Sequence, residues 1–434
     1  MQTQPLPGFR DFYPAEFAFR AHIFDTWRRT CARYGFEEFD GPPLEPLELY
    51  TAKSGEEIVG QLYNFSDKGG REVSLRPELT PTVARMVAAR AGGMKKPIRW
   101  FSIGQMFRYE RQQRGRLREF FQLNCDLMGE PGPLADAEII ALAVDLMRGF
   151  GLDAGAVRVR MSDRRILSTL LEVHGQTEEQ RGVWYQVLDK FARTPEPVSR
   201  ERLRGAGVAE ATVELLLGLS RQTAWEGLEE RLGGDPRVLS AFESLAAVKR
   251  ALDHMGLGDF VDFDFTIVRG IAYYTGTVFE LFDAGRSLRA IAGGGRYDEL
   301  LKLLGGVDLP AVGFAIGDVV LGELLQQRGL APAPASAIDA FVAGVTDADV
   351  PYVLHLAHAL RDGGVRVEYS LRAEPLGKQL KLADARAARF AVVIGPDDRA
   401  RGEVQLKDLQ GKTQRAVPAS ELSAALRSAL DRNS

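Results

Sequence analysis

The sequence predicts an α+β protein with an antiparallel sheet and flanking helices, a helical insertion, and a separate C-terminal α/β domain. Two apolar segments, residues 98–107 and 120–128, flank a polar hairpin as antiparallel neighbours do. Residues 162–250 are helical in pattern and rich in Arg, Glu and Leu. Beyond the stiff Ala-Pro stretch at 331–335, strand and helix patterns alternate, which is typical of a small parallel α/β sheet.

The composition suits a globular protein of roughly two or three domains and excludes a strong overall attraction to polyanions. Hydrophobic residues make up 45% and charged residues 26% of the 434 residues, and the formal net charge is −4. A bound polyanion would therefore be held by a local patch. Cys31 and Cys125 lie in apolar segments, which predicts buried thiols and a reducing compartment. No signal-peptide pattern and no apolar run of about 20 residues occurs, so we expect a cytoplasmic protein without membrane association.

The first 151 residues alternate between helical and extended patterns. Residues 16–34 predict a helix, because Ile23, Trp27 and Cys31 recur at a spacing of four and share one face. Gly35 is placed to end this helix. The further segments predicted here are an extended piece at 36–39, a strand at 73–75 with a loop at 76–80, a helix at 82–91, the strands at 98–107 and 120–128, and a helix at 135–150.

The second half holds the insertion, more strands and the last domain. Pro195 and Pro197 predict a loop between helices of the insertion. Residues 262–280 alternate as two strands joined near Gly270. The consecutive glycines at 293–295 predict a turn, because glycine reaches backbone conformations that cost other residues more. The remaining segments predicted are strands at 309–316, 340–345, 365–369 and 390–394, and helices at 318–327, 350–360 and 376–387.

The hairpin at 108–118 is the most distinctive segment, because it carries five arginines opposed only by Glu110. A guanidinium group binds phosphate through two parallel hydrogen bonds and keeps its charge at any working pH. The pattern therefore predicts a phosphate-binding hairpin presented by rigid strands. The alternative is a solvated surface loop, which charge runs often form.

Four segments, taken together and in order, resemble the histidyl-tRNA synthetase family of class II aminoacyl-tRNA synthetases. They are Leu75-Arg76-Pro77-Glu78-Leu79-Thr80, the hairpin from Phe107-Arg108-Tyr109-Glu110-Arg111 to Phe120-Phe121-Gln122-Leu123-Asn124-Cys125-Asp126, Ile267-Val268-Arg269-Gly270-Ile271-Ala272-Tyr273-Tyr274-Thr275-Gly276, and Gly293-Gly294-Gly295-Arg296-Tyr297-Asp298. The hairpin is similar to motif 2 of the class, and the third segment to the histidine-specific signature. The likeness runs from about Pro7 to the C-terminus and is weakest in the insertion.

The resemblance implies the class II synthetase antiparallel sheet with flanking helices, an inserted helical domain, a C-terminal α/β anticodon-binding domain, and a homodimer. The division it implies is a first catalytic part at 1–161 with motifs 1 and 2, the insertion at 162–250, a second catalytic part at 251–330 with the histidine signature and motif 3, a linker at 331–337, and an anticodon-binding-like domain at 338–434.

The implied activity is that of a histidine–tRNA ligase, an ATP-binding enzyme of protein biosynthesis. L-histidine attacks the α-phosphorus of ATP, with Mg²⁺ on the phosphates, and the histidyl group then passes to tRNA(His). Such a step needs positioning and charge cancellation around the phosphate. Arg108 and Arg269 match the family's α-phosphate positions and are expected to converge on one phosphorus. For Arg269 the alternative is a salt bridge to Asp262 or Asp264.

The resemblance also implies roles in binding the rest of ATP and the tRNA. Glu110 matches the acid beside the adenine, with pairing to Arg111 as its alternative, and Arg116 reaches toward the outer phosphates. Gln113 and Arg118 lie in the loop that faces the acceptor stem of the tRNA. Lys378, near the start of a helix in the last domain, matches an anticodon-domain segment, with a solvated helix face as its alternative. No metal-ligating set of protein residues is predicted.

Recognition of histidine is expected to rest on directed hydrogen bonds, because buried polar groups reject ligands that leave them unpaired. The resemblance places Glu78, Thr80 and Gln122 at the α-ammonium group. Asp126 and Tyr274 address the imidazole, and Tyr273 lines the pocket. The alternative for the two tyrosines is ordinary strand core.

Two departures from the family pattern concern ATP handling. Val320 stands where motif 3 carries an arginine for the γ-phosphate, and Ala272 stands where aspartate is usual. Arg116 and Arg296 are the candidates to supply the missing charge. A second hypothesis is therefore a catalytically silent paralogue, the regulatory subunit of ATP phosphoribosyltransferase in histidine biosynthesis. A third is a sensor that only binds tRNA or histidine. The presence of a last domain and of Arg108, Arg269, Glu78 and Gln122 favours the ligase.

Overall fold

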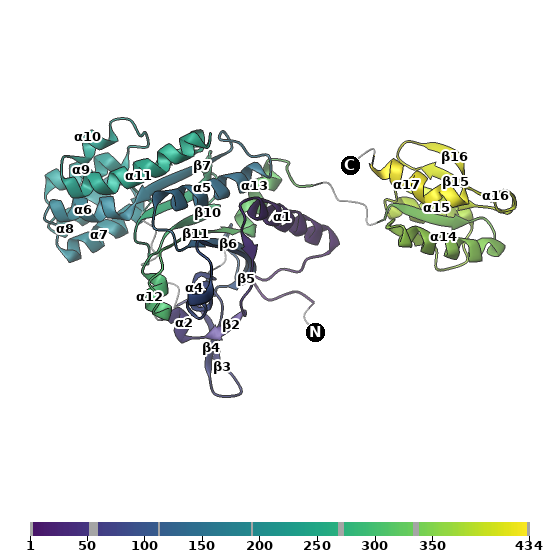
Figure 1. Cartoon of the computed structure of the whole chain (residues 1–434), viewed down its shortest axis with the longest axis horizontal. Coiled ribbons are helices and arrows are strands. Elements are labelled where there is room, and N and C mark those ends of the chain that lie inside the picture. The colour runs from purple at the N-terminus through teal and green to yellow at the C-terminus, as the bar shows by residue number, and fades with distance from the viewer. Residues whose placement is uncertain are drawn as a thin grey trace. The chain divides into compact units, whose positions relative to one another are not determined.

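The structure, a computed structural model, describes residues 3–51, 60–111, 113–191, 194–267, 273–332 and 338–431. The chain forms two compact units, Met1–Ala331 and Pro332–Ser434, which we treat separately. Figure 1 shows the sheet of the first unit with α1, α5 and α13 beside it and α6 to α10 gathered at one end.

The first unit is built on an eight-stranded sheet of order β1-β5-β6-β11-β10-β9-β7-β8. Its strands are β1 Glu37–Glu38, β5 Ile98–Phe107, β6 Glu119–Met128, β7 Val157–Asp163, β8 Val261–Phe263, β9 Thr277–Asp283, β10 Ala292–Arg296 and β11 Ala311–Gly317. The central strands are antiparallel, and only β1 and β8, at the two edges, run parallel to their neighbours. The predicted antiparallel pair at 98–107 and 120–128 is confirmed, with Ile98 opposite Met128 and Phe107 opposite Glu119.

The two strands predicted within 262–280 are found as β8 and β9, but they are not neighbours in the sheet, and Gly270, where we expected them to join, lies outside the described residues. Both β8 and β9 pair with β7, one on each side, so that β7 separates them. Strand β7 was missed, because no element was predicted between 151 and 161. Its arginines, Arg158 and Arg160, pair with Asp262 and Asp264, in and just after the neighbouring edge strand. The helices of the insertion accordingly begin at Arg164, after β7 ends.

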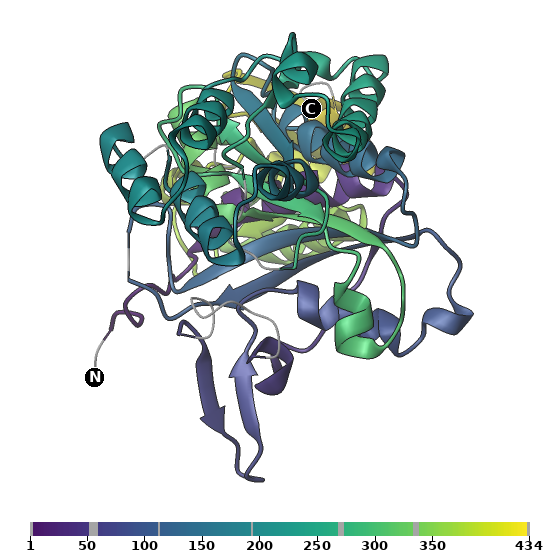
Figure 2. The ribbon, with the colours of Figure 1, turned by 90° about the vertical axis from the view of Figure 1, so that its left-hand side faces the viewer.

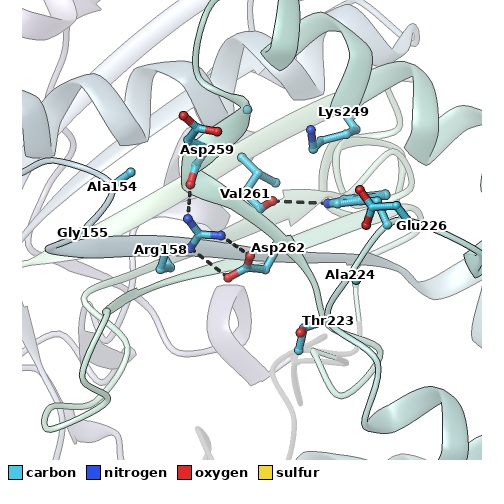
Figure 3. A pocket seen from close by; sticks show the side chains of 12 residues that line it. Ala154, Gly155, Arg158, Thr223, Ala224, Glu226, Lys249, Asp259, Val261 and Asp262 are labelled. Carbon is cyan, nitrogen blue, oxygen red and sulfur yellow. Dashed lines mark hydrogen bonds and ion pairs between the residues drawn. The ribbon is translucent and has the colours of Figure 1, made fainter.

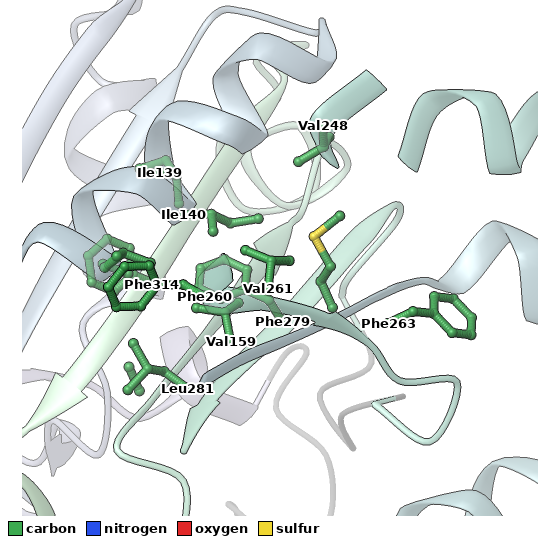
Figure 4. Packing of buried hydrophobic residues seen from close by; sticks show 14 of the residues in the cluster. Ile139, Ile140, Val159, Val248, Phe260, Val261, Phe263, Phe279, Leu281 and Phe314 are labelled. Carbon is green, nitrogen blue, oxygen red and sulfur yellow. The ribbon is translucent and has the colours of Figure 1, made fainter. Parts of the chain in front are cut away.

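Helices α1 (Pro14–Arg33), α5 (Pro133–Arg148), α11 (Pro236–His254) and α13 (Asp318–Gln327) bury their apolar sides in one continuous core with the sheet. Figure 4 shows Ile139 and Ile140 of α5 above Val159, Val261 and Phe279 of the strands. The helix predicted at 16–34 is confirmed, and Gly35 ends it with a φ of 71°. Both thiols are buried as predicted, and their Sγ atoms lie 3.6 Å apart.

The consecutive glycines at 293–295 form the middle of strand β10 and not a turn, so that prediction is wrong. The reason is close approach between strands. A Cβ on Gly294 would lie 2.3 Å from the Gly313 carbonyl oxygen and 2.5 Å from the Cβ of Phe314. A Cβ on Gly295 would lie 2.6 Å from the Thr277 carbonyl oxygen and 2.9 Å from the Tyr274 ring. Glycine is needed here for space rather than for an unusual φ.

We expect Gly294→Ala to destabilise the first unit by about 1–3 kcal/mol, because the added methyl group meets backbone that cannot move without breaking strand pairing. All four tryptophans, Trp27, Trp100, Trp184 and Trp225, belong to this unit, so a urea titration followed by tryptophan fluorescence reports its unfolding. Gly92→Ala is the control, because nothing lies within 4 Å of its added Cβ. Equal midpoints for the two variants would contradict the account of β10.

A smaller sheet and the insertion complete the first unit. Strands β2 (Leu44–Pro46), β3 (Tyr63–Ser66) and β4 (Glu72–Leu75) form an antiparallel sheet, and Figure 2 shows β3 and β4 extending from the body of this unit. The strand predicted at 73–75 is confirmed. Three short helices also belong here: α2 (Glu48–Thr51), α4 (Thr80–Ala88) and α12 (Leu300–Gly305). Of the insertion, α11 was described above; its other helices are α6 (Arg164–Val173), α7 (Glu178–Asp189), α8 (Glu196–Gly205), α9 (Glu210–Ser220) and α10 (Leu228–Leu232). Pro197 lies in the first turn of α8, where proline is tolerated, rather than in a loop.

The second unit is a five-stranded sheet of order β13-β12-β14-β15-β16 with helices against it. Its elements are β12 Ala340–Gly344, α14 Val350–Asp362, β13 Val367–Tyr369, α15 Leu376–Ala385, β14 Phe390–Ile394, α16 Pro396–Arg401, β15 Glu403–Asp408, β16 Thr413–Pro418 and α17 Leu422–Asp431. The predicted parallel strands are confirmed for β12, β13 and β14. The sheet is nevertheless mixed, because β15 and β16 add to it antiparallel.

In the part of the chain that the structure describes, no helix combines the length and apolar character that crossing a bilayer requires.

Candidate active site

A polar pocket of about 70 Å³ opens over the middle of the large sheet, where β6, β10 and β11 lie side by side. It brings together predicted residues from three distant segments of the chain: Glu78, Thr80, Arg108, Gln122, Asp126, Tyr273 and Tyr274. Residues that were given no binding role from the sequence also line it: Asn124, Gly293, Tyr297, Gly313, Phe314 and Ala315. Asn124 could have been found, because Gln122, Asn124 and Asp126 alternate along β6 and so share one face.

The loop that carries Glu78 and Thr80 is held by the buried side chain of Arg76. Arg76 Nε donates to the Gln105 carbonyl at 2.9 Å, and Nη1 donates to Asp40 Oδ1 at 2.9 Å and to the Gly41 carbonyl at 2.8 Å. These bonds tie the loop to β5 and to the chain before β2. Glu78 is fixed further by Tyr273, whose hydroxyl donates to Glu78 Oε2 at 3.3 Å.

Arg108 stands at the base of the arginine hairpin, just after β5. Its backbone amide donates to the Arg118 carbonyl at 2.9 Å, which closes the hairpin. Its side chain is oriented by two contacts: Nε donates to the Pro77 carbonyl at 2.9 Å, and the guanidinium carbon lies 5.4 Å from the centre of the Phe120 ring. The guanidinium is therefore held at the pocket before any ligand arrives.

Within the hairpin, Glu110 pairs with Arg116 at 2.7 Å and not with Arg111, the alternative considered for it. Gln113 accepts a hydrogen bond from Arg289 Nη2 at 2.6 Å. Arg118 lies over the Tyr109 ring at 4.2 Å and donates to the Glu110 carbonyl at 3.3 Å. The tip of the hairpin is therefore tied by several side-chain contacts.

Arg116 and Arg296, the two candidates to replace the missing motif 3 arginine, differ in whether their side chains are free to bind phosphate. Arg116 is half-exposed at the hairpin. Arg296 is buried and donates to Asp136, Asp298 and the carbonyls of Glu130 and Gly132, so the suggestion that it binds phosphate is wrong.

The sequence reading missed Arg289, which lies near Val320. A Cβ on Gly115 would be 3.3 Å from Val320 Cγ2 and 3.7 Å from Arg289 Cδ. Gly115 at the hairpin tip therefore lies against both Val320 and the side-chain stem of Arg289, whose guanidinium bonds to Gln113. No sequence signal marked Arg289, because it precedes the glycine motif as an isolated charge.

Arg269 and Ala272 lie outside the described residues, so the geometry of Arg269 is not part of this structure. Its two alternative partners are each paired with other arginines. Asp262 pairs with Arg158, and Asp264 pairs with Arg160 at 2.9 Å and with Arg286 at 3.4 Å.

Two buried groups of the pocket, Asp126 and Tyr297, have shifted pKa values. Burial raises the pKa of the Asp126 carboxyl to about 7, and a hydrogen bond from the Tyr297 hydroxyl opposes the shift. Burial and the neighbouring Asp126 raise the pKa of Tyr297 well above its ordinary value, so the phenol stays a donor. A carboxyl that titrates near neutral pH in a pocket is typical of functional sites.

A larger hollow, of about 470 Å³, lies elsewhere in the first unit, between the insertion and the strands β7 and β8. Figure 3 shows Arg158 bonded there to the Asp259 carbonyl and the Asp262 carboxylate. Its other cation, Lys249, pairs with Asp253. Because both cations are already held by acids, this hollow offers less to an anionic ligand than the pocket over the sheet.

A dedicated metal site is not found among the described residues, where no three of His, Cys, Asp or Glu gather closely enough to hold an ion. The carboxylates near the hairpin face arginines: Glu119 and Asp318 face Arg10, and Glu323 faces Arg114. These residues do not fit a protein cage for Mg²⁺.

In the second unit, Lys378 is exposed in the first turn of α15. The neighbouring Gln379 is buried and donates to the Gly344 and Glu374 carbonyls at 2.9 and 2.7 Å. These bonds fix the start of α15 against β12 and leave Lys378 facing solvent.

Comparison with known proteins gives the same relationship along almost the whole chain. The family model described as histidyl-tRNA synthetase matches residues 8–318, and an anticodon binding domain matches residues 339–429. Histidine–tRNA ligase of Opitutus terrae is 46% identical over 98% of this chain and 98% of that protein. The ligase of Natronomonas pharaonis is 42% identical over 95% of each.

Among solved structures, histidyl-tRNA synthetase from Nostoc superposes with a TM-score of 0.85 at 25% identity, covering 98% of this chain and 99% of that one. The predicted class II architecture is thereby confirmed. With the family model spanning both motif-bearing parts of the sheet, the chain belongs to the histidyl-tRNA synthetase family.

Proposed function

We propose that this protein is a histidine–tRNA ligase that activates L-histidine with ATP and transfers it to tRNA(His). The observation that carries the proposal is the convergence of Arg108, Glu78 and Asp126 on one pocket in a chain of this family. These three groups complement histidyl-adenylate: Arg108 offers a cation to its phosphate, Glu78 an acid to its ammonium group, and Asp126 a buried acid to its imidazole.

The first step forms a bond between a carboxylate oxygen of histidine and the α-phosphorus of ATP, and pyrophosphate leaves. The carboxylate is already ionised, so no general base is needed. Arg108 offsets charge on the phosphate, and Arg269 is proposed to act from the opposite side. Because Arg108 is held by Pro77 and Phe120 beforehand, little reorganisation is needed as charge develops.

Histidine is proposed to lie with its ammonium group toward Glu78, Thr80 and Gln122. Its imidazole lies toward Asp126 and Tyr274, with Tyr273 between the two ends. The bond from Tyr273 to Glu78 supports this arrangement, because it links the two ends of the pocket. A ligand without a ring N–H would leave the buried Asp126 Oδ2 without a donor, at a large cost in affinity.

The rest of ATP is proposed to lie along the hairpin, with Glu110 at the adenine and Arg116 at the outer phosphates. Magnesium is expected only as a companion of the ATP phosphates, as is usual for this ion, and we derive no step through it. Gln113 and Arg118 are proposed to meet the acceptor stem of the tRNA. Lys378 and the second unit are proposed to bind the anticodon. Catalysis is thus assigned to residues 1–330 and anticodon binding to residues 338–434.

We further propose that the protein works as a homodimer in the cytoplasm. The family resemblance motivates the dimer, and the two reduced, buried thiols are in keeping with a reducing compartment. Sedimentation of the purified protein tests the dimer.

The purified protein is expected to exchange pyrophosphate into ATP only when histidine is present, because the reverse of activation requires histidyl-adenylate. Labelled pyrophosphate incorporation measures this directly, with alanine in place of histidine as the control. Histidine binding without any exchange would instead favour the second hypothesis, a regulatory subunit of ATP phosphoribosyltransferase. The anticodon binding domain at 339–429 favours the ligase over that alternative.

A further inference from the structure

Tyr297 lies beneath the proposed histidine pocket, where its hydroxyl donates a hydrogen bond to Asp126 Oδ1. Its backbone is fixed by an amide bond to the Ala311 carbonyl at 2.8 Å. Its ring is 2% exposed and meets the Tyr273 ring edge to face, with centroids 5.9 Å apart. The hydroxyl therefore has one defined position from which to hold the carboxylate.

The other carboxylate oxygen is in a different situation. Asp126 Oδ2 is buried, and none of the described residues gives it a hydrogen bond. A buried carboxylate oxygen without a donor is costly unless a ligand supplies one. Because Asp126 lines the pocket, a ligand N–H is the natural donor.

The opposite strand is shaped to allow this orientation. Gly313 stands opposite Asp126 in the β6–β11 register. A Cβ at Gly313 would lie 2.3 Å from Asp126 Oδ1. Only glycine leaves room for the carboxylate to turn toward Tyr297 with one oxygen while presenting the other to the pocket.

We propose that Tyr297 is a positioning residue for histidine selection: its hydroxyl orients the Asp126 carboxylate and stabilises its ionised form, so that Oδ2 accepts the imidazole N–H. This inference rests on the proposed function and adds a residue to it. Tyr297 itself acts through Asp126.

The ionisation of Asp126 gives the inference a pH signature. Burial raises the pKa of Asp126, and the Tyr297 hydroxyl, which donates to the ionised form, lowers it. Removing the hydroxyl must therefore raise the pKa of Asp126 further. The carboxylate then becomes protonated at a higher pH than in the native protein. The other titratable groups around it, which the substitution leaves in place, are Glu78, Arg108, Tyr273, Tyr274 and Cys125.

The test is Tyr297→Phe, which keeps the ring and removes only the hydroxyl. Pyrophosphate exchange is measured against histidine concentration over a range of pH. We expect KM for histidine to rise about tenfold, the usual effect of one lost hydrogen bond to a buried charge, with KM for ATP unchanged. The acidic limb of kcat/KM for histidine should move to higher pH. An unchanged KM and pH profile would overturn the inference.

Two further variants distinguish an effect that Tyr297 exerts through Asp126 from a general structural effect of the substitution. In an Asp126→Asn background, adding Tyr297→Phe should have no further effect on KM for histidine, whereas an equal penalty in both backgrounds overturns the inference. Tyr34→Phe is the matched control, because Tyr34 also donates to a carboxylate, Asp145 at 2.8 Å, away from the pocket. It should leave KM and the pH profile as they are.

Calorimetric titration of histidine into the same variants distinguishes this inference from the proposed function. If the unmodified protein shows no exchange, the ligase proposal fails, yet weaker histidine binding by Tyr297→Phe would still support the role of Tyr297. Equal histidine affinities for the two proteins would overturn it whatever the exchange result.

Discussion

Arg108→Ala is expected to lower kcat/KM for histidine-dependent pyrophosphate exchange by about a thousandfold. Removing a single preorganised donor from a developing negative charge lowers kcat by about 10²–10³-fold in other enzymes. We expect a full guanidinium to lie at the upper end of that range. The Pro77 carbonyl and the Phe120 ring hold this group in place. Histidine binding measured by calorimetry should change little, because Arg108 is proposed to act on phosphate.

The matched controls for Arg108 are a conservative variant and a remote arginine. Arg108→Lys keeps the charge but loses the forked geometry, so exchange should fall between the native and alanine values. Arg71→Ala removes an arginine whose side chain is 80% exposed beside Asp67, and exchange should be unaffected. Native exchange in Arg108→Ala would remove this residue from the mechanism. Arg269→Ala, at a position outside the described residues, is expected to abolish exchange in the same assay.

Asp136→Ala is expected to destabilise the first unit by about 3–5 kcal/mol, the largest stability effect we foresee. Asp136 and Arg296 are bonded at 2.7 Å with side chains 3% and 5% exposed. Alanine would leave a buried guanidinium without its main counter-charge. The pair links α5 to the end of β10, directly before Tyr297, so the loss also loosens the floor of the pocket.

Tryptophan fluorescence during urea unfolding measures this loss, since every tryptophan belongs to the first unit. Arg237→Ala is the control, because it breaks an ion pair to Asp235 in which the arginine is 62% exposed and screened by water. Its midpoint should match that of the native protein. A midpoint for Asp136→Ala as high as that of the control would show that the buried pair contributes no net stability.

Local patterns predicted the parts of this fold in which a short segment determines its own conformation. The helix at 16–34 and the strands at 98–107 and 120–128 follow from apolar spacing, and Asp318–Gln327 begins and ends where predicted. Strand β7 was missed because its arginines are satisfied by acids in and after a strand a hundred residues later. No local window contains that information.

Some residues of the candidate site could be selected from the sequence, and others could not. Motif resemblance selected Glu78, Arg108, Gln122, Asp126, Tyr273 and Tyr274, which the structure gathers in one pocket. It included Tyr297 in the fourth motif but assigned it no role, and the glycine run before it was predicted to be a turn. It also suggested Arg296 for phosphate, which a buried bond to Asp136 prevents. Arg289 was not selected either, although it bonds to Gln113 of the hairpin and lies close to Gly115.

Motifs along the chain were enough to assign the family and the residue types that the chemistry requires, because motifs keep charge and hydrogen-bonding capacity in a fixed order. Which of those groups are available to a ligand depends on the fold. The partners of each side chain in space set this availability: Arg296 of β10 is neutralised by Asp136 of α5, whereas Asp126 keeps one oxygen open opposite Gly313, which lacks a side chain. Burial and partners in space, which sequence spacing does not encode, set the charge state and direction of each group.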